Sequence, residues 1–216
     1  MEVSQAVKQR KSIRGFLPTS IEDEALSSLL EQAARAPSGG NVQPWRIYVI
    51  NKSRMDDFKT HLQEFTLGES EYPIYPPKLQ EPYRTNRYEL GEEMYALLGI
   101  PREDKAARLA NMAKNYDFFG APAAFFCFVD RSMGSAQWSD LGMFLQTFML
   151  LAEEVGLGTC AQEAWSMHYE AVSAFVKAPE NEMLFCGMSI GYPDWDQPVN
   201  TLESKRMPLE QWCTWA

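Results

Sequence analysis

The segment Ala123-Ala-Phe-Phe-Cys-Phe-Val129 decides the fold, because it contains no polar residue and is rich in aromatic side chains. A short run that is apolar throughout, rather than alternating with polar residues, is typical of a strand buried on both faces. Two similar runs lie at Arg46-Ile-Tyr-Val-Ile50 and between Met183 and Ile190. The sequence therefore predicts a central sheet that contains these strands.

Helical patterns separate the predicted strands. Thr19 and Glu22 match a capping box, and apolar residues then recur on one face, so we expect a helix over residues 20–35 that stops at Ala36-Pro37. Further helices are expected at residues 52–65, 84–98, 102–115, 137–155 and 167–177. This mixture predicts an α+β protein with a shell of helices around the sheet.

One domain over residues 1–216 is expected, because no internal repeat and no Gly/Ser linker interrupts the chain. The Pro- and Tyr-rich stretch Tyr72-Pro-Ile-Tyr-Pro-Pro77 indicates a lid-like excursion over residues 66–90, whose role the sequence leaves open. Residues 200–216 carry no core pattern and are expected to form a C-terminal extension.

Composition and charge exclude several classes of protein. The chain has 216 residues, of which 45% are hydrophobic and 23% charged, as in an ordinary globular protein, and its net charge of -9 disfavours nucleic acid and anionic membranes as partners. The apolar stretch from Leu141 to Ala152 contains Gly142, Gln146 and Thr147, so it predicts a buried core helix rather than a membrane span. The N-terminus has no secretion signal, and we expect a cytoplasmic protein.

Metal and disulfide sites are not expected, because the chain has four cysteines without a C-x-x-C pair and only two histidines. Cys160 is interpreted as a buried structural thiol. The segment Gly156-Leu-Gly-Thr-Cys-Ala161 matches a dinucleotide-binding pattern, but a predicted helix rather than a strand precedes it. We therefore expect Gly156 to be the glycine that ends this helix.

The segment Arg10-Lys11-Ser12-Ile13-Arg14 is a candidate anion site in an otherwise acidic chain. Arginine offers forked donors that suit phosphate, and a serine hydroxyl adds another donor. A solvated basic helix end would explain the same residues, and their pattern alone leaves both interpretations open.

A second candidate is Ala36-Pro-Ser-Gly-Gly-Asn-Val-Gln-Pro-Trp45, between a predicted helix and a predicted strand. Its glycines allow close backbone approach to a ligand or partner, Ser38, Asn41 and Gln43 can hydrogen-bond, and Trp45 supplies a flat apolar surface. Turn chemistry alone would explain the glycines and prolines, but it does not require the amides or the tryptophan.

Together these two segments resemble the FMN-dependent nitroreductase family. The segments Gly156 to Trp165 and Gly187 to Pro208 are similar to later blocks of that family, in the same order, so the resemblance covers nearly the whole chain. The stretch Glu81 to Tyr88 is similar to the branch that contains nitrobenzoate and nitrobenzene reductases. The resemblance implies a nitroreductase-like fold, with a central, mostly antiparallel sheet surrounded by helices, in a homodimer.

The resemblance also implies the site residues. Arg10 and Ser12 would meet the phosphate and ribityl chain of FMN, with Lys11 in the same cofactor site; Arg14 would face the N1/O2 edge of the flavin; Lys205 and Arg206 would close on the phosphate. The backbone of Gln162, Glu163 and Ala164 would approach flavin N5, and it stays open whether the Glu163 side chain acts as well. The other subunit would contribute Pro37, Ser38, Gly39 and Asn41. The aromatic faces and cations of the segment Tyr72 to Tyr88 make Tyr83, Arg84 and Arg87 candidate substrate residues, although a surface loop packed by its own tyrosines would explain the same residues.

Two positions depart from the family pattern. Gly39 stands where many relatives have serine, and Ala164 stands where others have glycine, so one polar contact is in doubt and N5 is slightly crowded. Neither change argues against FMN.

The activity implied is that of an enzyme, an NAD(P)H-dependent FMN nitroreductase, in which hydride passes in two steps from NADH or NADPH to a small nitroaromatic or quinone-like acceptor. No catalytic side chain beyond the flavin is expected. The alternatives are an FMN enzyme with another acceptor, through reductive dehalogenation, enone reduction or flavin breakdown, and a non-catalytic flavin-binding redox protein. The sequence does not distinguish NADH from NADPH or identify the physiological acceptor.

Overall fold

The computed structural model describes residues 1–216 and contains a four-stranded antiparallel sheet with the strand order β1-β2-β4-β3. Each neighbouring pair of strands is antiparallel. The strands are β1 (Arg46–Asn51), β2 (Ala123–Asp130), β3 (Gly158–Gln162) and β4 (Glu182–Gly191). The predicted α+β class and the three predicted strands are confirmed.

Seven α-helices surround the sheet: α1 (Val3–Gln9), α2 (Asp23–Ala33), α3 (Ser53–Leu62), α4 (Tyr83–Leu97), α5 (Lys105–Ala113), α6 (Ser135–Glu154) and α7 (Tyr169–Val176). Short 3-10 helices include η1 (Gly39–Asn41), η2 (Lys114–Gly120) and η3 (Glu163–His168), followed by η4 (Pro198–Thr201) and η5 (Leu209–Gln211). Six of the α-helices coincide with the predicted ones, apart from their ends; α1 was not predicted.

The predicted capping box at Thr19 was wrong. The helix α2 begins at Asp23 after Glu22, and no side chain caps its first turn. The preceding residue Ile21 is only 3% exposed and belongs to the core, and its carbonyl accepts a hydrogen bond from Asn51 Nδ2 at 2.8 Å. These contacts hold the segment before Glu22 outside the helix.

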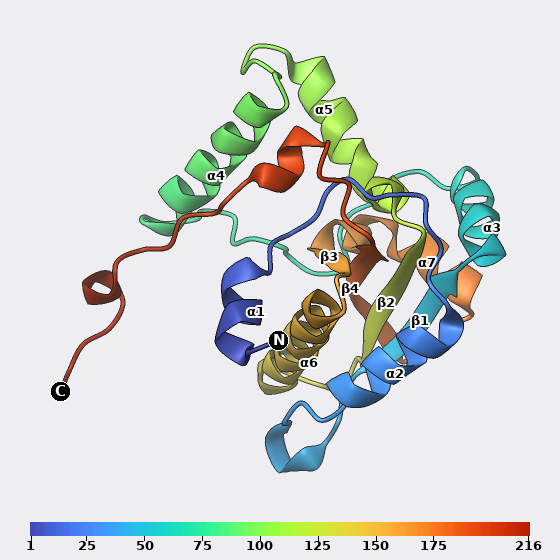
Figure 1. Ribbon diagram of the computed structural model, residues 1–216. Coiled ribbons are helices and arrows are strands. Elements are labelled where there is room, and N and C mark those ends of the chain that lie inside the picture. Colours follow the sequence, from blue (N-terminus) through green and yellow to red (C-terminus); the bar gives the residue numbers. More distant parts are fainter.

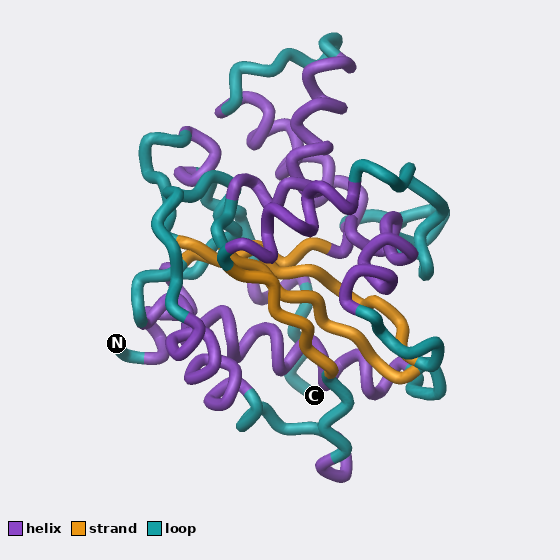
Figure 2. Tube along the Cα trace, turned by 90° about the vertical axis from the view of Figure 1, so that its right-hand side faces the viewer, coloured by secondary structure: helices purple, strands orange, loops and turns teal.

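Side chains of β2 alternate between two hydrophobic clusters, one on each face of the sheet. Phe125 and Cys127 pack with α2 and α6, whereas Phe126 and Phe128 pack with α3, η2 and α7. Figure 2 shows the sheet between these layers of helices. Burial on both faces explains why β2 is apolar throughout.

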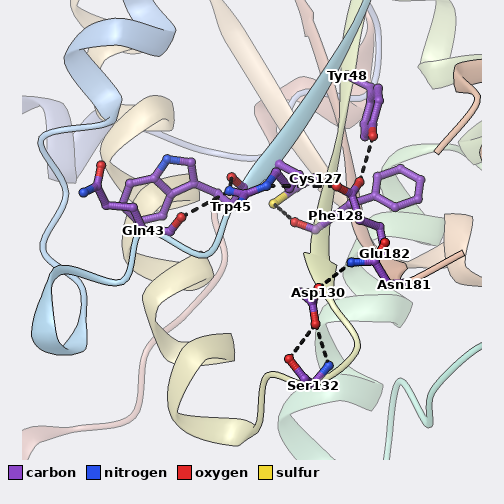
Figure 3. Close-up of polar contacts among 10 residues, drawn as sticks. Gln43, Trp45, Tyr48, Cys127, Phe128, Asp130, Ser132, Asn181 and Glu182 are labelled. Carbon is purple, nitrogen blue, oxygen red and sulfur yellow. Dashed lines mark hydrogen bonds and ion pairs between the residues drawn. The ribbon is translucent and has the colours of Figure 1, made fainter. Parts of the chain in front are cut away.

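The predicted strands meet at a polar cluster, shown in Figure 3. Tyr48 Oη donates to Glu182 Oε2 at 2.7 Å, which joins β1 to β4. Asn181 Nδ2 donates to Asp130 Oδ2 at 2.6 Å, which joins the residue before β4 to the end of β2. These contacts fix the order of the strands at one end of the sheet.

The strand β3 was not among the strands predicted from the sequence. Gly156 has a φ of 78° directly after the end of α6, so it is the helix-ending glycine that was predicted. The chain then enters β3 after a single residue, Leu157. A five-residue segment that contains glycine, threonine and glutamine lacks the apolar pattern of the other strands.

The segment between α3 and α4 is anchored to the body at its first half. Gly68 N donates to Met167 O at 3.0 Å, and Glu71 both forms an ion pair with Arg131 and accepts a hydrogen bond from Leu184 N at 3.1 Å. The helices α4 and α5 then project from the body, and the C-terminal segment extends away from it (Figure 1). None of the helices has the length and the apolar character that crossing a membrane would require.

Candidate functional site

A cleft of about 750 Å³ lies beside β3 and η3. Residues of α6, α5 and η2 form its walls, and most of its lining is hydrophobic. Residues 161–164, where β3 passes into η3, line it together with Tyr75 and Arg87. A neighbouring hollow of about 530 Å³ shares Tyr75, Arg87 and Ala161 with the cleft and adds Arg14.

Residues 10–14 run beside β3 because their backbone is bonded to it. Ser12 forms a bridge with Thr159, and Ile13 N donates to Thr159 O at 2.9 Å. The Ile13 side chain is 2% exposed and anchors the segment in the core. Arg14 thereby lines the hollow that adjoins the cleft and shares Ala161 with it.

The C-terminal part of the chain is tied to residues 10–15. Asn200 is fully buried; its Oδ1 accepts a hydrogen bond from Arg14 N at 2.7 Å, and its Nδ2 donates to Gly15 O at 2.8 Å. Lys11 Nζ lies 3.7 Å from Glu203 Oε1. These contacts hold Asn200 and Glu203 beside residues 11–15, whereas Lys205 and Arg206 line a separate hollow beside α4.

The predicted cofactor cations fall into two groups. Lys11 and Lys205 each form an ion pair, with Glu203 and Glu93 respectively. Arg10, Arg14 and Arg206 form none, and Arg10 Nε is buried without a hydrogen-bond partner. A buried guanidinium nitrogen without a partner costs free energy unless an acceptor reaches it. This donor set fits a phosphate-bearing ligand such as FMN.

The three residues predicted to approach N5 lie where β3 ends. Gln162 is 2% exposed and its side chain is engaged inside the protein: Nε2 donates to Asn115 O at 2.8 Å, and Oε1 accepts from Ser189 Oγ at 2.6 Å. Its side chain is therefore occupied, which leaves backbone groups of residues 162–164 for a ligand. Ala164 O accepts a 3.4 Å hydrogen bond from Tyr116 Oη.

Glu163 lines the cleft among apolar walls. Desolvation raises the pKa of its carboxyl above the ordinary 4.5. Cys160, by contrast, is 3% exposed, and burial raises the pKa of its thiol. The expected burial of Cys160 is confirmed.

The loop predicted to contact the flavin from another subunit does not line the cleft of its own chain. Gly39 N donates to Asp140 Oδ1 at 3.2 Å, and Ser38 Oγ accepts from Gln43 N at 3.0 Å. Pro37 and Asn41 are exposed. The fold of one chain thus brings Arg14 together with residues 161–164, but not with residues 37–41.

The predicted substrate residues lie in the first turns of α4 and differ in their surroundings. Tyr83 is 60% exposed. Arg84 is paired with Glu81, with Nη2 and Oε1 2.5 Å apart. Arg87 lines the cleft, and its guanidinium carbon lies 4.2 Å from the centroid of the Tyr75 ring.

Several residues of the site were not predicted. Met112, Asn115 and Tyr116 form part of the cleft wall, and Asn200 positions Arg14. No local pattern marks them, because each becomes part of the site only through the packing of α5, η2 and η4 against distant segments.

The chain is similar over nearly its whole length to known nitroaromatic reductases. The chain is 33% identical to nitrobenzene nitroreductase of Ectopseudomonas oleovorans, over 98% of this chain and 96% of that protein. It is 35% identical to 4-nitrobenzoate reductase of Pseudomonas putida, over 94% and 89%. The crystal structure of FMN and NADPH-dependent nitroreductase NfnB from Sphigopyxis sp. strain HMH matches with a TM-score of 0.95 and 38% identity, covering 100% of this chain and 99% of that one.

This structural match confirms the predicted nitroreductase-like fold. The model of the Nitroreductase family matches residues 7–192, which include the basic segment beside β3, the cleft and the whole sheet. On this match and the curated relatives, the chain belongs to the nitroreductase family.

Proposed function

We propose that this protein is an FMN-dependent oxidoreductase that uses NADH or NADPH to reduce nitroaromatic or quinone-like acceptors. The observation that carries the proposal is the junction of an apolar cleft with unpaired arginines beside residues 161–164. The relatives named above are nitroaromatic reductases, and the similar crystal structure is that of an FMN and NADPH-dependent enzyme. NAD(P)H is produced in the cytoplasm, where we expect the protein to act.

FMN supplies the hydride chemistry when it is bound, accepting hydride from the nicotinamide and delivering it to the acceptor. Arg10, Ser12 and Arg206, assisted by Lys11 and Lys205, would hold its phosphate and ribityl chain. Arg14 would supply positive charge beside the ring system, where it favours the reduced form. The backbone of Gln162, Glu163 and Ala164 would approach N5.

The cleft walls accept the flat acceptor. Apolar side chains from α5, α6 and η2 exclude water from one side, and Arg87 of α4 lines the cleft together with Tyr75. Tyr83 lines a neighbouring hollow with Arg87. One cleft serves nicotinamide and acceptor in turn, which gives a ping-pong sequence. Residues 66–90 act as a lid over it.

Two copies of the chain complete two sites. Pro37, Ser38, Gly39 and Asn41 are polar or backbone groups without a role in their own chain's cleft, so they serve the site of the partner. The C-terminal extension supports association, because Trp212 and Trp215 are 63% and 88% exposed on a segment that leaves the body. Large aromatic side chains so exposed are typical of surfaces that bind another protein.

The visible spectrum tests the proposal directly. Purified protein is expected to carry the absorbance of oxidised flavin, to lose it when NADH or NADPH is added without oxygen, and to regain it when a nitroaromatic is added. A colourless protein that FMN does not reconstitute would contradict cofactor binding. If NADH or NADPH removes the flavin absorbance and no nitroaromatic or quinone restores it, the protein is a flavoprotein with another acceptor.

Replacing Arg10 tests the phosphate assignment. A charge-assisted hydrogen bond contributes about 1.5 to 3 kcal/mol, so Arg10→Ala is expected to weaken FMN binding by roughly 10- to 150-fold. Titration of the apoprotein with FMN, followed by quenching of flavin fluorescence, measures this change. Lys8→Ala is the control, because Lys8 is exposed in α1 and is expected to leave the affinity unchanged.

A further inference from the structure

Two arginines lie one helical turn apart on α4, but only one of them is free to bind an anion. Arg84 donates through Nε to Glu81 Oε1 at 2.6 Å, and Nη2 is 2.5 Å from the same oxygen. Arg87 forms neither an ion pair nor a hydrogen bond with any residue of the chain. The charge of Arg84 is therefore compensated within the chain, and that of Arg87 is not.

Arg87 lies where it can contact an acceptor bound in the cleft. It lines the same cleft as residues 161–164, where the reacting end of an acceptor must lie, and it lines the hollow that contains Arg14. Tyr75 lies under its guanidinium, 4.2 Å from ring centroid to guanidinium carbon. A guanidinium stacked on an aromatic ring keeps its forked N–H donors directed outward in the ring plane.

None of the acidic groups nearby forms an ion pair with Arg87, and this includes Glu89, which lines a neighbouring hollow with it. On α4, Glu92 is held by Arg108, with Oε1 and Nη1 2.6 Å apart, and Glu93 is held by Lys205. Glu163 is the acidic residue of the cleft lining itself, and it forms no ion pair with Arg87. The cleft thus combines apolar walls with a cation that has no ion-pair partner.

We infer that Arg87 selects carboxylated nitroaromatic acceptors by binding the carboxylate in a forked pair of hydrogen bonds, with Tyr75 as the residue that positions its guanidinium. This inference rests on the proposed function, because it concerns the acceptor of that same cleft. A carboxylate opposite the nitro group of a benzene ring would let the apolar walls hold the ring between Arg87 and the reacting edge.

Steady-state kinetics of the FMN-loaded enzyme test the inference. Arg87→Gln is expected to lower kcat/KM for 4-nitrobenzoate by about 5- to 30-fold and to leave kcat/KM for nitrobenzene within about twofold. The loss is expected in KM rather than kcat, because the carboxylate is bound equally before and during the reaction. Arg84→Gln is the matched control, and it is expected to leave the ratio of the two substrates unchanged.

Equilibrium binding gives a readout that does not depend on turnover. Benzoate, which cannot be reduced as a nitro compound, is expected to bind wild type about 5- to 30-fold more tightly than Arg87→Gln by isothermal titration calorimetry, and this difference should shrink as ionic strength rises. Tyr75→Phe is expected to retain benzoate binding, whereas Tyr75→Ala weakens it. Arg87→Lys, which keeps the charge without the fork, should bind benzoate with intermediate affinity.

The outcomes separate the inference from the proposed function. Unchanged benzoate binding in Arg87→Gln, or a parallel loss for nitrobenzene, would overturn the role of Arg87. A rise in KM for NADPH but not NADH would assign Arg87 to the 2′-phosphate of the nicotinamide cofactor and would equally overturn it. Arg87-dependent benzoate binding in a protein that fails to reduce any nitroaromatic would contradict the proposed function and leave carboxylate recognition standing.

Discussion

Asn200 holds the backbone of Arg14 across a separation of 186 residues, with Arg14 N donating to Asn200 Oδ1 at 2.7 Å. The same side chain donates to Gly15 O at 2.8 Å and to Asp194 O at 2.8 Å. Because Asn200 is 0% exposed, no water replaces these bonds when the amide is lost. A buried amide therefore sets the position of the arginine proposed to face the flavin.

Replacing Asn200 by the similarly sized Leu leaves Arg14 N without its partner, whereas Gly15 O still accepts from Asp194 N and Asp194 O still accepts from Gln197 N. An unsatisfied buried donor costs about 1–3 kcal/mol, so Asn200→Leu is expected to lower the free energy of unfolding by about that amount and to weaken FMN binding. Urea denaturation of the apoprotein and FMN titration measure the two effects. Asn181→Ala removes an exposed amide that bonds Asp130, and it should leave the FMN affinity unchanged. Unaltered FMN affinity in folded Asn200→Leu would contradict the role assigned to Asn200.

Gly158 permits the close approach of residues 10–14 to β3. A Cβ at this position would lie 2.5 Å from Ile13 Cγ1 and 2.9 Å from Pro193 Cγ. Gly158→Ala is therefore expected to cost about 1–3 kcal/mol in overpacking and, because Ile13 lies between Ser12 and Arg14, to weaken FMN binding. Thermal unfolding and flavin titration would detect both changes.

The control for Gly158 is Gly91 in α4, where an added methyl group would meet no atom of a neighbouring segment within 4 Å. Gly91→Ala replaces a poor helix former by the best one, and it is expected to stabilise the protein by up to about 1 kcal/mol. Equal destabilisation by the two substitutions would show that the contact with Ile13 is not the cause.

Glu163 predicts a pH-dependent stability. Desolvation raises the pKa of its carboxyl above the ordinary 4.5, so the folded state holds the proton at pH values where the unfolded chain has released it. Stability from this group is thus full below the unfolded pKa and is lost as pH rises through the folded pKa. Glu163→Gln removes this loss of stability, so its Tm is expected to rise relative to wild type as pH increases above the ordinary carboxyl pKa of 4.5.

Thermal melts of the two proteins at several pH values measure this difference. The control is Glu64→Gln, a substitution at an exposed residue outside the cleft. A difference for Glu163→Gln that stays constant across the range would refute the predicted desolvation.

Subunit complementation tests whether Arg14 and Asn41 serve one flavin from two chains. Dimers of Arg14→Ala chains and dimers of Asn41→Ala chains are both expected to be impaired. In a mixed dimer, one site carries both defects and the other carries neither. Because about half of a random mixture is heterodimer, roughly a quarter of the sites should regain wild-type behaviour after the variants are unfolded and refolded together.

The measurement is NADH-driven nitroaromatic reduction, compared with the mean of the variants refolded separately. Activity no higher than this mean, in a sample shown to contain heterodimers, would rule out the shared site. If complementation occurs and each single variant still binds one FMN per chain, the substitutions impair turnover rather than cofactor binding.

The sequence by itself predicted the elements in which every residue has the same kind of surroundings, such as a strand buried on both faces. The strand β2 is buried on both faces, so every residue from Ala123 to Val129 had to be apolar and the strand was visible without its partners. Gly156 was identifiable as the end of α6, because a positive φ at that position favours glycine whatever surrounds it. The basic segment Arg10 to Arg14 was likewise marked by its residue types.

Only the tertiary structure decided which of these residues act together. β3 carries no strand pattern of its own, because its pairing with β4 and with residues 12–13 stabilises it. Arg84 and Arg87 are equivalent in the sequence, and the contact of Arg84 with Glu81 makes them different. Asn200 contributes through a bond to a residue near the other end of the chain. Local propensity acts over a few residues, whereas pairing, charge compensation and burial depend on groups that only the folded chain brings within a few ångströms.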